Sequence, residues 1–257
     1  MDATIVSVAT PSMISSLGLS TTEVQWVQEV YTLVFAALLM VWGTMSDRIG
    51  RRRLLVIGLV LFVAASILCA FAPTGTWLIA ARALQGVGGS MILPTTLTLL
   101  NATFRGGERS IAFAVWGATI GSMAAVGPVL GGWLTTAFSW HWAFWINLPF
   151  GVLAVAGVLI CVAESRQHDT GRFTDWIGAA ASVLGFGMLV FALIEGRAYG
   201  WWEATDSAPL SLGAFSIIPV LFALAVIVLA LLVLRERARG AAGKSAPRRE
   251  TDAVPVN

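Results

Sequence analysis

Arg82 is a charged side chain near the start of the long apolar run Trp77–Leu100. If this run crosses a bilayer, insertion of the arginine costs about 2.5 kcal/mol or more. We therefore expect Arg82 to face the protein interior or a water-filled cavity, beside an acid, and Gln85 one turn further on extends this polar face. The alternative is that Arg82 only reaches back to the membrane surface, because it stands close to the start of the helix.

Two acids stand in comparable places. Glu29 lies near the start of the apolar run Val24–Met45, and Asp2 precedes the apolar stretch Ala3–Leu17. Acids inside a membrane protein favour a lipophilic cation over an anion as ligand. Glu29 could instead be an outer-surface acid solvated by lipid headgroups. Because almost no chain precedes Asp2, we expect this carboxylate at the membrane surface.

The densest charge cluster is the stretch GTMSDRIGRRR, residues 43–53. An acid at a helix end, here Asp47, can bind an arginine or the N-terminus of a neighbouring helix. Glycines allow a tight turn and close approach. We interpret the cluster as a latch that holds two helices together at one membrane face and opens in another conformation. Its residues are Gly43, Asp47, Arg48, Gly50, Arg51 and Arg52, although the arginines could also be simple topological anchors.

Chemistry of other kinds has no support in the residue pattern. There is no pairing of nucleophile and base, no phosphate-binding loop and no spacing of metal ligands. Cys69 and Cys161 both lie in apolar runs and imply neither a disulfide nor a metal site. The net charge is only +2, without a basic stripe. We therefore expect no enzyme, no metal, no cofactor and no nucleic-acid partner.

The elements that carry these residues are membrane-spanning helices. Only 12% of the 257 residues are charged, and the mean hydropathy is +0.82. Soluble domains have about 25% charged residues. A bilayer core needs about 20 apolar residues per helix, and the short run Ala3–Leu17 is followed by seven runs of that length. The seven runs are Val24–Met45, Leu54–Ala72, Trp77–Leu100, Ile111–Phe138, Trp142–Val162, Trp176–Ile194 and Leu210–Leu234.

Basic residues collect in alternate connections. Residues 46–53 contain four arginines, 101–110 two, 163–175 two, and the tail 235–257 six of the 16 basic residues. The other connections contain a single arginine, Arg197. Cytoplasmic loops carry the excess of Lys and Arg. This predicts a multi-pass protein of the cell membrane with both termini in the cytoplasm.

Several stretches, in order, resemble the motifs of one family. Gly43–Arg53 matches G-x-x-x-D-R-x-G-R-R, and Met1–Pro11 (MDATIVSVATP) is similar to LDxTIVNVALP. Arg82–Gly89 matches R-x-x-Q-G-x-G, Ala124–Gly132 partly matches G-x-x-x-G-P-x-x-G-G, and Trp142–Pro149 (WAFWINLP) resembles the sixth helix of the same family. From residue 1 to about residue 234, the chain resembles the major facilitator superfamily of secondary transporters, in its 14-span drug:proton antiporter branch.

The resemblance implies roles for the polar residues. Arg82 matches an arginine that serves proton coupling, and Gln85 belongs to the same motif. Asp2 matches the acid of the first helix, and acids in the first two helices, including Glu29, act in proton or cation recognition. The energy source would be the proton gradient. The substrate would be a small molecule, lipophilic or cationic.

The fifth-helix match contains Gly127, Pro128, Gly131 and Gly132. GxxxG spacing lets two helices approach closely, and proline removes one backbone hydrogen bond and kinks the helix. Plain helix packing would explain these residues. The resemblance adds that this antiporter helix lies between the two halves of the transporter, where it favours exchange over leak.

Together these observations predict an all-α membrane protein with eight transmembrane helices. Residues 1–163 form a six-helix bundle whose first helix is truncated, 164–234 hold a cytoplasmic loop and two linking helices, and 235–257 form a disordered basic tail. We expect a proton-coupled antiporter of a bacterial inner membrane that exports drugs, lipophilic cations or metabolites. Its second bundle is expected to be missing. The open alternatives are a truncated, non-functional fragment and a half-transporter or membrane scaffold that must dimerise.

Overall fold

A computed structural model describes residues 1–164, 176–205, 211–212 and 215–244. This part of the chain is helical except for short connections and one pair of two-residue strands, β1 (Ser211–Leu212) and β2 (Phe215–Ser216), which are antiparallel. The helices are α1 (Asp2–Leu17), α2 (Thr21–Ile49), α3 (Arg51–Ala70), α4 (Gly75–Thr103), α5 (Gly106–Ala137), α6 (Trp142–Trp145), α7 (Asn147–Cys161), α8 (Trp176–Tyr199) and α9 (Ile218–Lys244).

The length and composition of the helices suit a membrane. In the described part, six helical segments are long and apolar enough to cross a bilayer, namely α2, α3, α4, α5, α6 together with α7, and α9. α8 has a shorter apolar stretch, Ala180–Leu193, and α1 has 16 residues. Large apolar side chains lie on the outside of the helices, for example Val129 at 73% and Ile160 at 82% exposure. Soluble proteins rarely expose such continuous apolar surface, so the predicted all-α membrane fold is confirmed.

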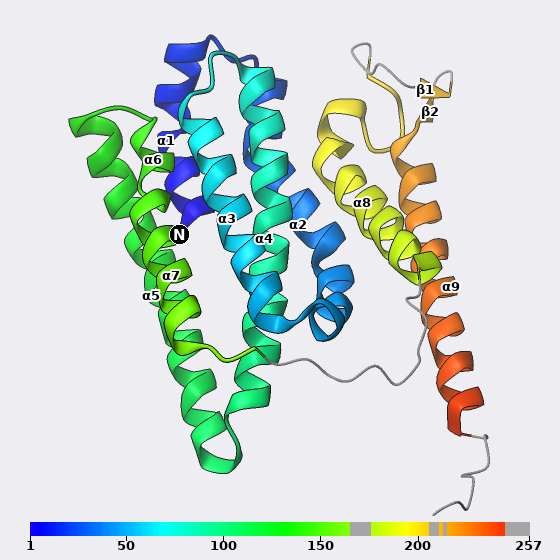
Figure 1. The fold of residues 1–257 in the computed structure, drawn as a ribbon. Helices are drawn as coiled ribbons and strands as arrows, with labels where there is room; N and C mark the ends of the chain where they lie inside the picture. The colour runs from blue at the N-terminus through cyan, green and yellow to red at the C-terminus, as the bar shows by residue number, and fades with distance from the viewer. Residues whose placement is uncertain (165–175, 206–210, 213–214, 245–257) are drawn as a thin grey trace, which may run out of the picture.

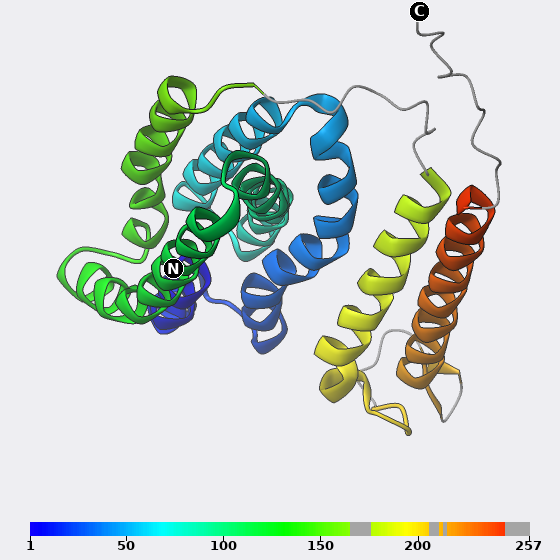
Figure 2. The same cartoon turned by 90° about the horizontal axis from the view of Figure 1, so that it is seen from below.

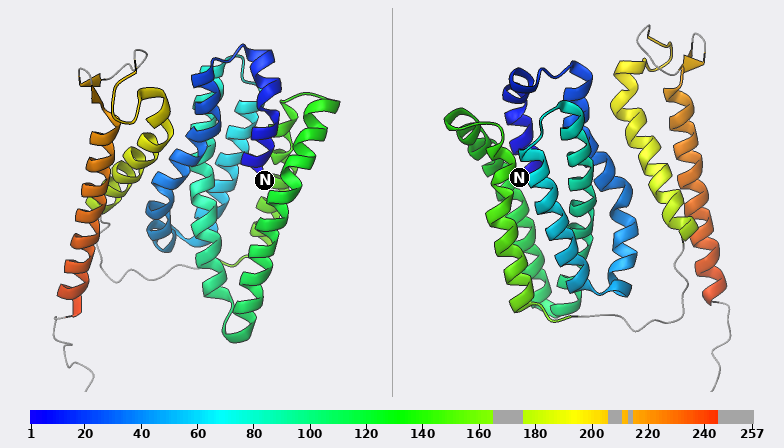
Figure 3. Two further views of the ribbon diagram at one scale, coloured as in Figure 1. Left: turned by 180° about the vertical axis from the view of Figure 1, so that it is seen from behind. Right: turned by 45° about the horizontal axis from the view of Figure 1, so that its top comes forward.

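The helices form a bundle with an attached hairpin. Figures 1 and 3 show α1 to α7 gathered together, while α8 and α9 run side by side next to α2. Figure 2, seen from below, shows this hairpin on the α2 side of the bundle. Its contact includes the rings of Trp26 on α2 and Phe191 on α8, whose centroids are 5.9 Å apart. The hairpin therefore extends one edge of the bundle and does not enter its core.

The connections alternate between the two ends of the bundle. The α1–α2, α3–α4, α5–α6 and α8–α9 connections lie at the upper end in Figure 1, and the α2–α3 and α4–α5 connections lie at the lower end. At the upper end Gly18 terminates α1 with φ +64°. Ser20 then caps α2, accepting the Glu23 N–H while its own N–H donates to the Glu23 carboxylate. Such alternation is what repeated crossing of a bilayer requires.

The turn between α2 and α3 is shorter than the loop predicted over residues 46–53. α2 continues to Ile49 and α3 begins at Arg51, so Gly50 alone makes the turn, with φ +107°. Only glycine adopts this backbone region at little cost, as expected for Gly50. Gly43 differs, because it lies inside α2 and an added Cβ would be 3.8 Å from Pro94. Gly43 thus lies in the helix that the apolar run Val24–Met45 predicts, and the predicted loop was too long because hydropathy marks where lipid ends and not where the helix ends.

The sixth predicted span, Trp142–Val162, contains a break. α6 ends at Trp145, and α7 begins at Asn147. Pro149 has no N–H to donate to the Trp145 carbonyl four residues earlier, which interrupts the helical hydrogen bonding at this place. The break brings Asn147 to the first position of α7, where its side chain is buried in the bundle.

α4 packs closely against α2 and α3 through glycines. A Cβ on Gly88 would lie 2.6 Å from the Phe62 backbone nitrogen on α3, and one on Gly86 would lie 2.8 Å from the Tyr31 carbonyl on α2. Both distances are far below van der Waals contact, so no other residue fits without moving a backbone. This packing places α4, with Arg82 and Gln85, at the centre of the bundle.

The last helix differs from its predicted limits at both ends. α9 begins at Ile218, not Leu210, because Ser211–Ser216 include the two short strands. At the other end α9 continues to Lys244, so residues 235–244 of the predicted disordered tail are helical. The sequence Arg-Glu-Arg-Ala-Arg after Leu234 consists of good helix formers, which explains the extension. The prediction for residues 245–257 lies outside the described residues.

Candidate functional site

A carboxylate and a guanidinium meet inside the bundle. Asp2, at the first position of α1, has a side chain that is 9% exposed, and Arg82 on α4 is fully buried. Arg82 Nη1 lies 2.5 Å from Asp2 Oδ2. The expectation that Asp2 lies at the membrane surface is therefore wrong. Because α1 begins at the level of Arg82, its first residue, Asp2, faces the core of the bundle. The alternative that Arg82 only reaches back to the membrane surface is also wrong, since its side chain is fully buried.

Two amide side chains complete the contacts of the carboxylate. Gln85 Nε2 and Asn147 Nδ2 each donate to Asp2 Oδ1 at 2.9 Å. Three donors from α4 and α7 therefore surround one carboxylate. Hydrogen bonds to charged groups are worth about 1.5–3 kcal/mol each, and in a buried place a carboxyl without partners would be very costly.

Ser66 on α3 connects the two amides. Its hydroxyl accepts from Gln85 Nε2 at 2.7 Å and from Asn147 Nδ2 at 3.2 Å, and donates to the Phe62 carbonyl at 2.9 Å. Asp2, Ser66, Arg82, Gln85 and Asn147 are called the Asp2 network below. Sequence reasoning missed Ser66 and Asn147. The signal for Asn147 was present, since it is the single amide in the apolar run Trp142–Val162.

Arg82 keeps one nitrogen without a partner. Its Nε donates to the Val27 carbonyl at 3.2 Å, and Nη1 also donates to Gln85 Oε1 at 2.7 Å. The guanidinium carbon lies 4.6 Å from the centroid of the Tyr31 ring, a cation–π arrangement. Nη2 is buried and has no hydrogen bond to any residue that the structure describes. The network therefore has one donor available for a water, a proton acceptor or a ligand atom.

The fifth helix holds α1 in place. A Cβ on Gly127 would collide with the side chain of Thr4, and one on Gly131 would lie 3.1 Å from the Ile5 Cα. These two glycines let α5 touch α1 directly beside Asp2. Pro128 lies on the exposed face of α5, and Gly132 makes only an ordinary contact with Val8. The glycines thus have a packing role inside the bundle, and the face with Pro128 stays uncovered by the described residues.

Glu29 is the predicted site residue that the structure does not bring to the network. It is half-buried on α2, and no interaction in the described part joins it to Asp2 or Arg82. Near the same level Gln28 donates to Thr10 on α1 at 3.0 Å. The acid expected in the second helix therefore stands apart from the buried pair.

The charge cluster in residues 43–53, called the loop cluster below, links α3 to the end of α7. Arg52 donates from Nη2 to the Leu159 carbonyl at 2.6 Å and from its backbone N–H to Glu164 Oε1 at 3.3 Å. Arg53 Nε lies 3.5 Å from Glu164 Oε2. Sequence reasoning did not select Glu164, which follows α7. Arg51 stands in the first turn of α3, whereas the side chains of Asp47 and Arg48 lie outside the described residues, so the latch proposed for them is not visible.

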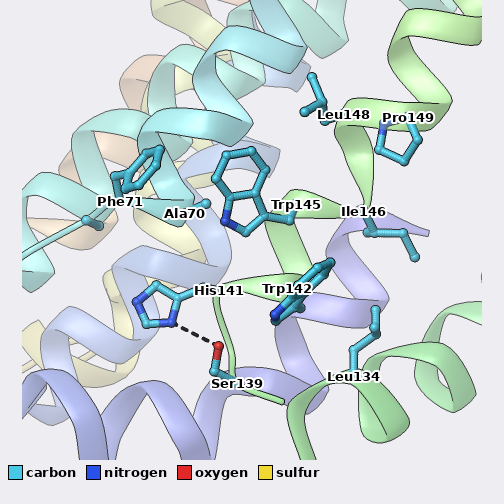
Figure 4. Close-up of a pocket in the computed structure, with 11 residues that line it drawn as sticks. Ala70, Phe71, Leu134, Ser139, His141, Trp142, Trp145, Ile146, Leu148 and Pro149 are labelled. Atoms are coloured by element: carbon cyan, nitrogen blue, oxygen red, sulfur yellow. Dashed lines mark hydrogen bonds between the residues drawn. The ribbon is translucent and has the colours of Figure 1, made fainter. Parts of the chain in front are cut away.

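An apolar pocket opens at the upper end of the bundle. It has a volume of about 810 Å³ and lies between the end of α3 and the α5–α7 region. Figure 4 shows Trp142, Trp145 and Phe71 lining the pocket, with a hydrogen bond between the side chains of His141 and Ser139. Burial lowers the pKa of His141, so the ring is neutral at neutral pH and the pocket has no charge of its own. The pocket is separate from the Asp2 network, whose residues do not line it.

In the described residues, no three His, Cys, Asp or Glu side chains lie close enough together to hold a metal ion. The largest cluster of buried polar side chains in the described residues is the carboxylate–guanidinium pair with its amides. Residues 1–175 match the family model described as Major Facilitator Superfamily. The chain belongs to the major facilitator superfamily. The helical membrane fold described above agrees with this membership.

Curated members of the superfamily share substantial identity with the chain. A probable actinorhodin transporter of Streptomyces coelicolor is 38% identical over 205 residues, which cover 78% of this chain and 35% of that protein. A puromycin resistance protein of Streptomyces alboniger is 39% identical over 85% of this chain and 43% of its own length. A methylenomycin A resistance protein of Bacillus subtilis is 35% identical over 92% of this chain and 48% of its own length. The chain thus spans less than half the length of these relatives.

Proposed function

We propose that the chain provides the proton-coupling half of an antiporter that exports drugs, lipophilic cations or metabolites. The observation that carries the proposal is the Asp2–Arg82 pair, buried between helices and joined by Gln85 and Asn147. Relatives named as puromycin and methylenomycin A resistance proteins support a drug as substrate class. We infer a bacterial inner membrane as its location, as expected for such transporters.

The pair suits proton exchange for an electrostatic reason. Ionised Asp2 satisfies Arg82 and both amides, whereas a protonated Asp2 releases the guanidinium from its counter-charge. Breaking a buried pair by removing one partner costs about 3–5 kcal/mol, so protonation favours a different arrangement of α1 against α4. A proton and a cationic substrate therefore compete for one carboxylate, which is the requirement for antiport.

Orientation is part of the proposal. The lower connections in Figure 1 include the α2–α3 turn with Arg51, Arg52 and Arg53 and the α4–α5 turn with Arg105 and Arg109. The bias of arginine toward the cytoplasmic side would put this end inside the cell, together with the end of α9, whereas the first residue of α1 lies at the level of Arg82 inside the bundle (Figure 1). The loop cluster with Glu164 would lie at the inner membrane face.

A second bundle completes the pathway in this proposal. Residues 1–163 form one bundle, and 164–234 contain the linking hairpin. α5 buries only Gly127, Gly131 and Leu134 over its 32 residues, so most of its surface is free for another bundle, either the second half of a longer protein or a second copy of this chain. The alternative is a fragment that binds substrate without transporting it.

The experiment is exchange in proteoliposomes containing the purified chain. An inside-acidic pH gradient should drive ethidium into the vesicles, and Arg82→Ala should abolish this while Arg109→Ala, an exposed arginine, should not. Uptake that does not depend on the pH gradient, or that persists in the Arg82→Ala variant, contradicts the coupling role of the Asp2–Arg82 pair. Crosslinking distinguishes a dimer from a single chain, and ethidium binding without uptake favours the fragment.

A further inference from the structure

Glu195 is a buried acid that the Asp2 network does not use. Sequence reasoning placed it in the outer connection 195–209, but the structure places it inside α8, one turn before the helix ends at Tyr199. Its relative exposure is 2%. α8 packs against α9 on one side and α2 on the other, so Glu195 lies in the hairpin and outside the six-helix core.

No positive charge accompanies this carboxyl in the described part of the chain. Its Oε1 is buried without a hydrogen-bond partner, and no ion pair there includes Glu195. Arg197, two residues on, is exposed. On the neighbouring half of α2 the ionisable groups are the acids Glu23 and Glu29, with Tyr31 beyond them, and α9 has none between Ile218 and Leu234. The acids of this part of α2 thus have the same sign as an ionised Glu195, and the nearby arginine in the described residues, Arg197, is exposed and forms no ion pair with it.

The surroundings are aromatic. Phe191 and Tyr199 lie one turn before and one turn after Glu195 on the same face of α8. The Phe191 ring contacts Trp26 of α2 at 5.9 Å and Tyr199 at 6.1 Å between centroids. Because Oε1 of an ionised carboxylate in this place would be buried without a donor from the described residues, protonation is the least costly way to keep it buried.

We propose that Glu195 is a second proton-binding site, which holds a proton while α8 is packed between α2 and α9. This site goes beyond the proposed coupling role of Asp2 and does not depend on it, since the two carboxyls stand on different elements and only Asp2 has a guanidinium partner. The neutral acid stabilises the contact of the hairpin with the bundle. Loss of the proton would place an unpaired charge there and weaken that contact.

The test is infrared spectroscopy of the full chain in lipid nanodiscs at neutral pH. The wild-type spectrum should contain the carbonyl band of a protonated carboxyl, and Glu195→Gln should remove it. The matched control is Glu203→Gln, since Glu203 is exposed in the connection that follows α8, and Asp2→Asn tests the other buried acid. A spectrum without this band, or a band that survives Glu195→Gln, overturns the proposal.

A second measurement needs no variant. Dicyclohexylcarbodiimide attaches to protonated carboxyls in apolar surroundings, and mass spectrometry of peptides locates the adduct. On the wild-type chain the adduct should form at Glu195 and spare Glu203. Labelling should fall as the pH is raised enough to open the hairpin. An adduct pattern that spares Glu195 while labelling exposed acids contradicts a protonated Glu195, whatever the result for transport at Asp2.

Discussion

At the residue scale, the central feature is a carboxylate whose contacts come from helices far apart in sequence. Arg82 was predicted from its charge in apolar surroundings and from motif resemblance. Asp2 was predicted from the motif alone and was expected at the membrane surface, where the structure does not place it. Asn147 and Ser66 were not predicted, because their importance arises only when α3 and α7 pack against α4. A single amide in an apolar run indicates that its side chain has a polar partner, but it does not identify the partner residue. Asn147 is 81 positions from Ser66 and 145 positions from Asp2 in the sequence. Contacts over such separations have no local sequence signature.

Asn147→Leu removes one donor from the carboxylate while keeping the volume of the side chain. We expect the variant to lose about 1.5–3 kcal/mol of stability, the value of a hydrogen bond to a charged group. Thermal unfolding of the purified chain in detergent measures the loss. Asn101→Leu is the matched control, since Asn101 is exposed at the end of α4, and an equal effect of both variants would argue against the bond to Asp2.

A double-mutant cycle isolates the pair itself. Arg82→Gln leaves a buried carboxylate without its counter-charge and should cost about 3–5 kcal/mol. In an Asp2→Asn background the same change should cost far less, because no charge is left unpaired. The difference between the two costs, measured by unfolding, is the coupling energy. Additive costs would mean that the two side chains do not interact.

At the element scale, glycine positions decide how closely the helices pack. Gly88→Ala places a Cβ 2.6 Å from the backbone of Phe62 and should lower the unfolding temperature as α3 and α4 separate. Gly121→Ala is the control, since nothing lies within 4 Å of its Cβ, and helix propensity alone should make it neutral or stabilising by up to about 1 kcal/mol. The account fails at this scale if Gly88→Ala is as well tolerated as Gly121→Ala.

The elements themselves were largely predictable, and their ends were not. Each predicted span corresponds to a helix or, for Trp142–Val162, to the two helices α6 and α7, because a run of about 20 apolar residues has few other solutions. The break at Ile146, the shortness of the α2–α3 turn and the extension of α9 to Lys244 were missed. Helices continue past the lipid boundary where backbone hydrogen bonds and helix propensity allow, whereas the hydropathy of a run reports only the lipid boundary. The contact of Glu164 with α3 was missed for the same reason as Asn147.

At the scale of the whole molecule, the account depends on which end of the bundle faces the cytoplasm. In a Cys161→Ser background, Glu203→Cys in the α8–α9 connection should react with a membrane-impermeant maleimide on intact cells. Glu108→Cys at the start of α5 should react only after the membrane is permeabilised. Both positions are exposed, so accessibility of the side chain does not bias the comparison. The reverse pattern would invert the bundle and the direction of transport.

The measurement closest to the central claim is proton release on substrate binding. The purified chain is first equilibrated at an acidic pH that protonates Asp2. It then receives tetraphenylphosphonium in weakly buffered detergent solution, and a pH indicator records the protons released. We predict release by the wild type, and binding without release by Asp2→Asn, which keeps the size of the side chain but cannot ionise. Undiminished proton release from Asp2→Asn would show that the buried carboxylate beside Arg82 is not where proton and substrate compete.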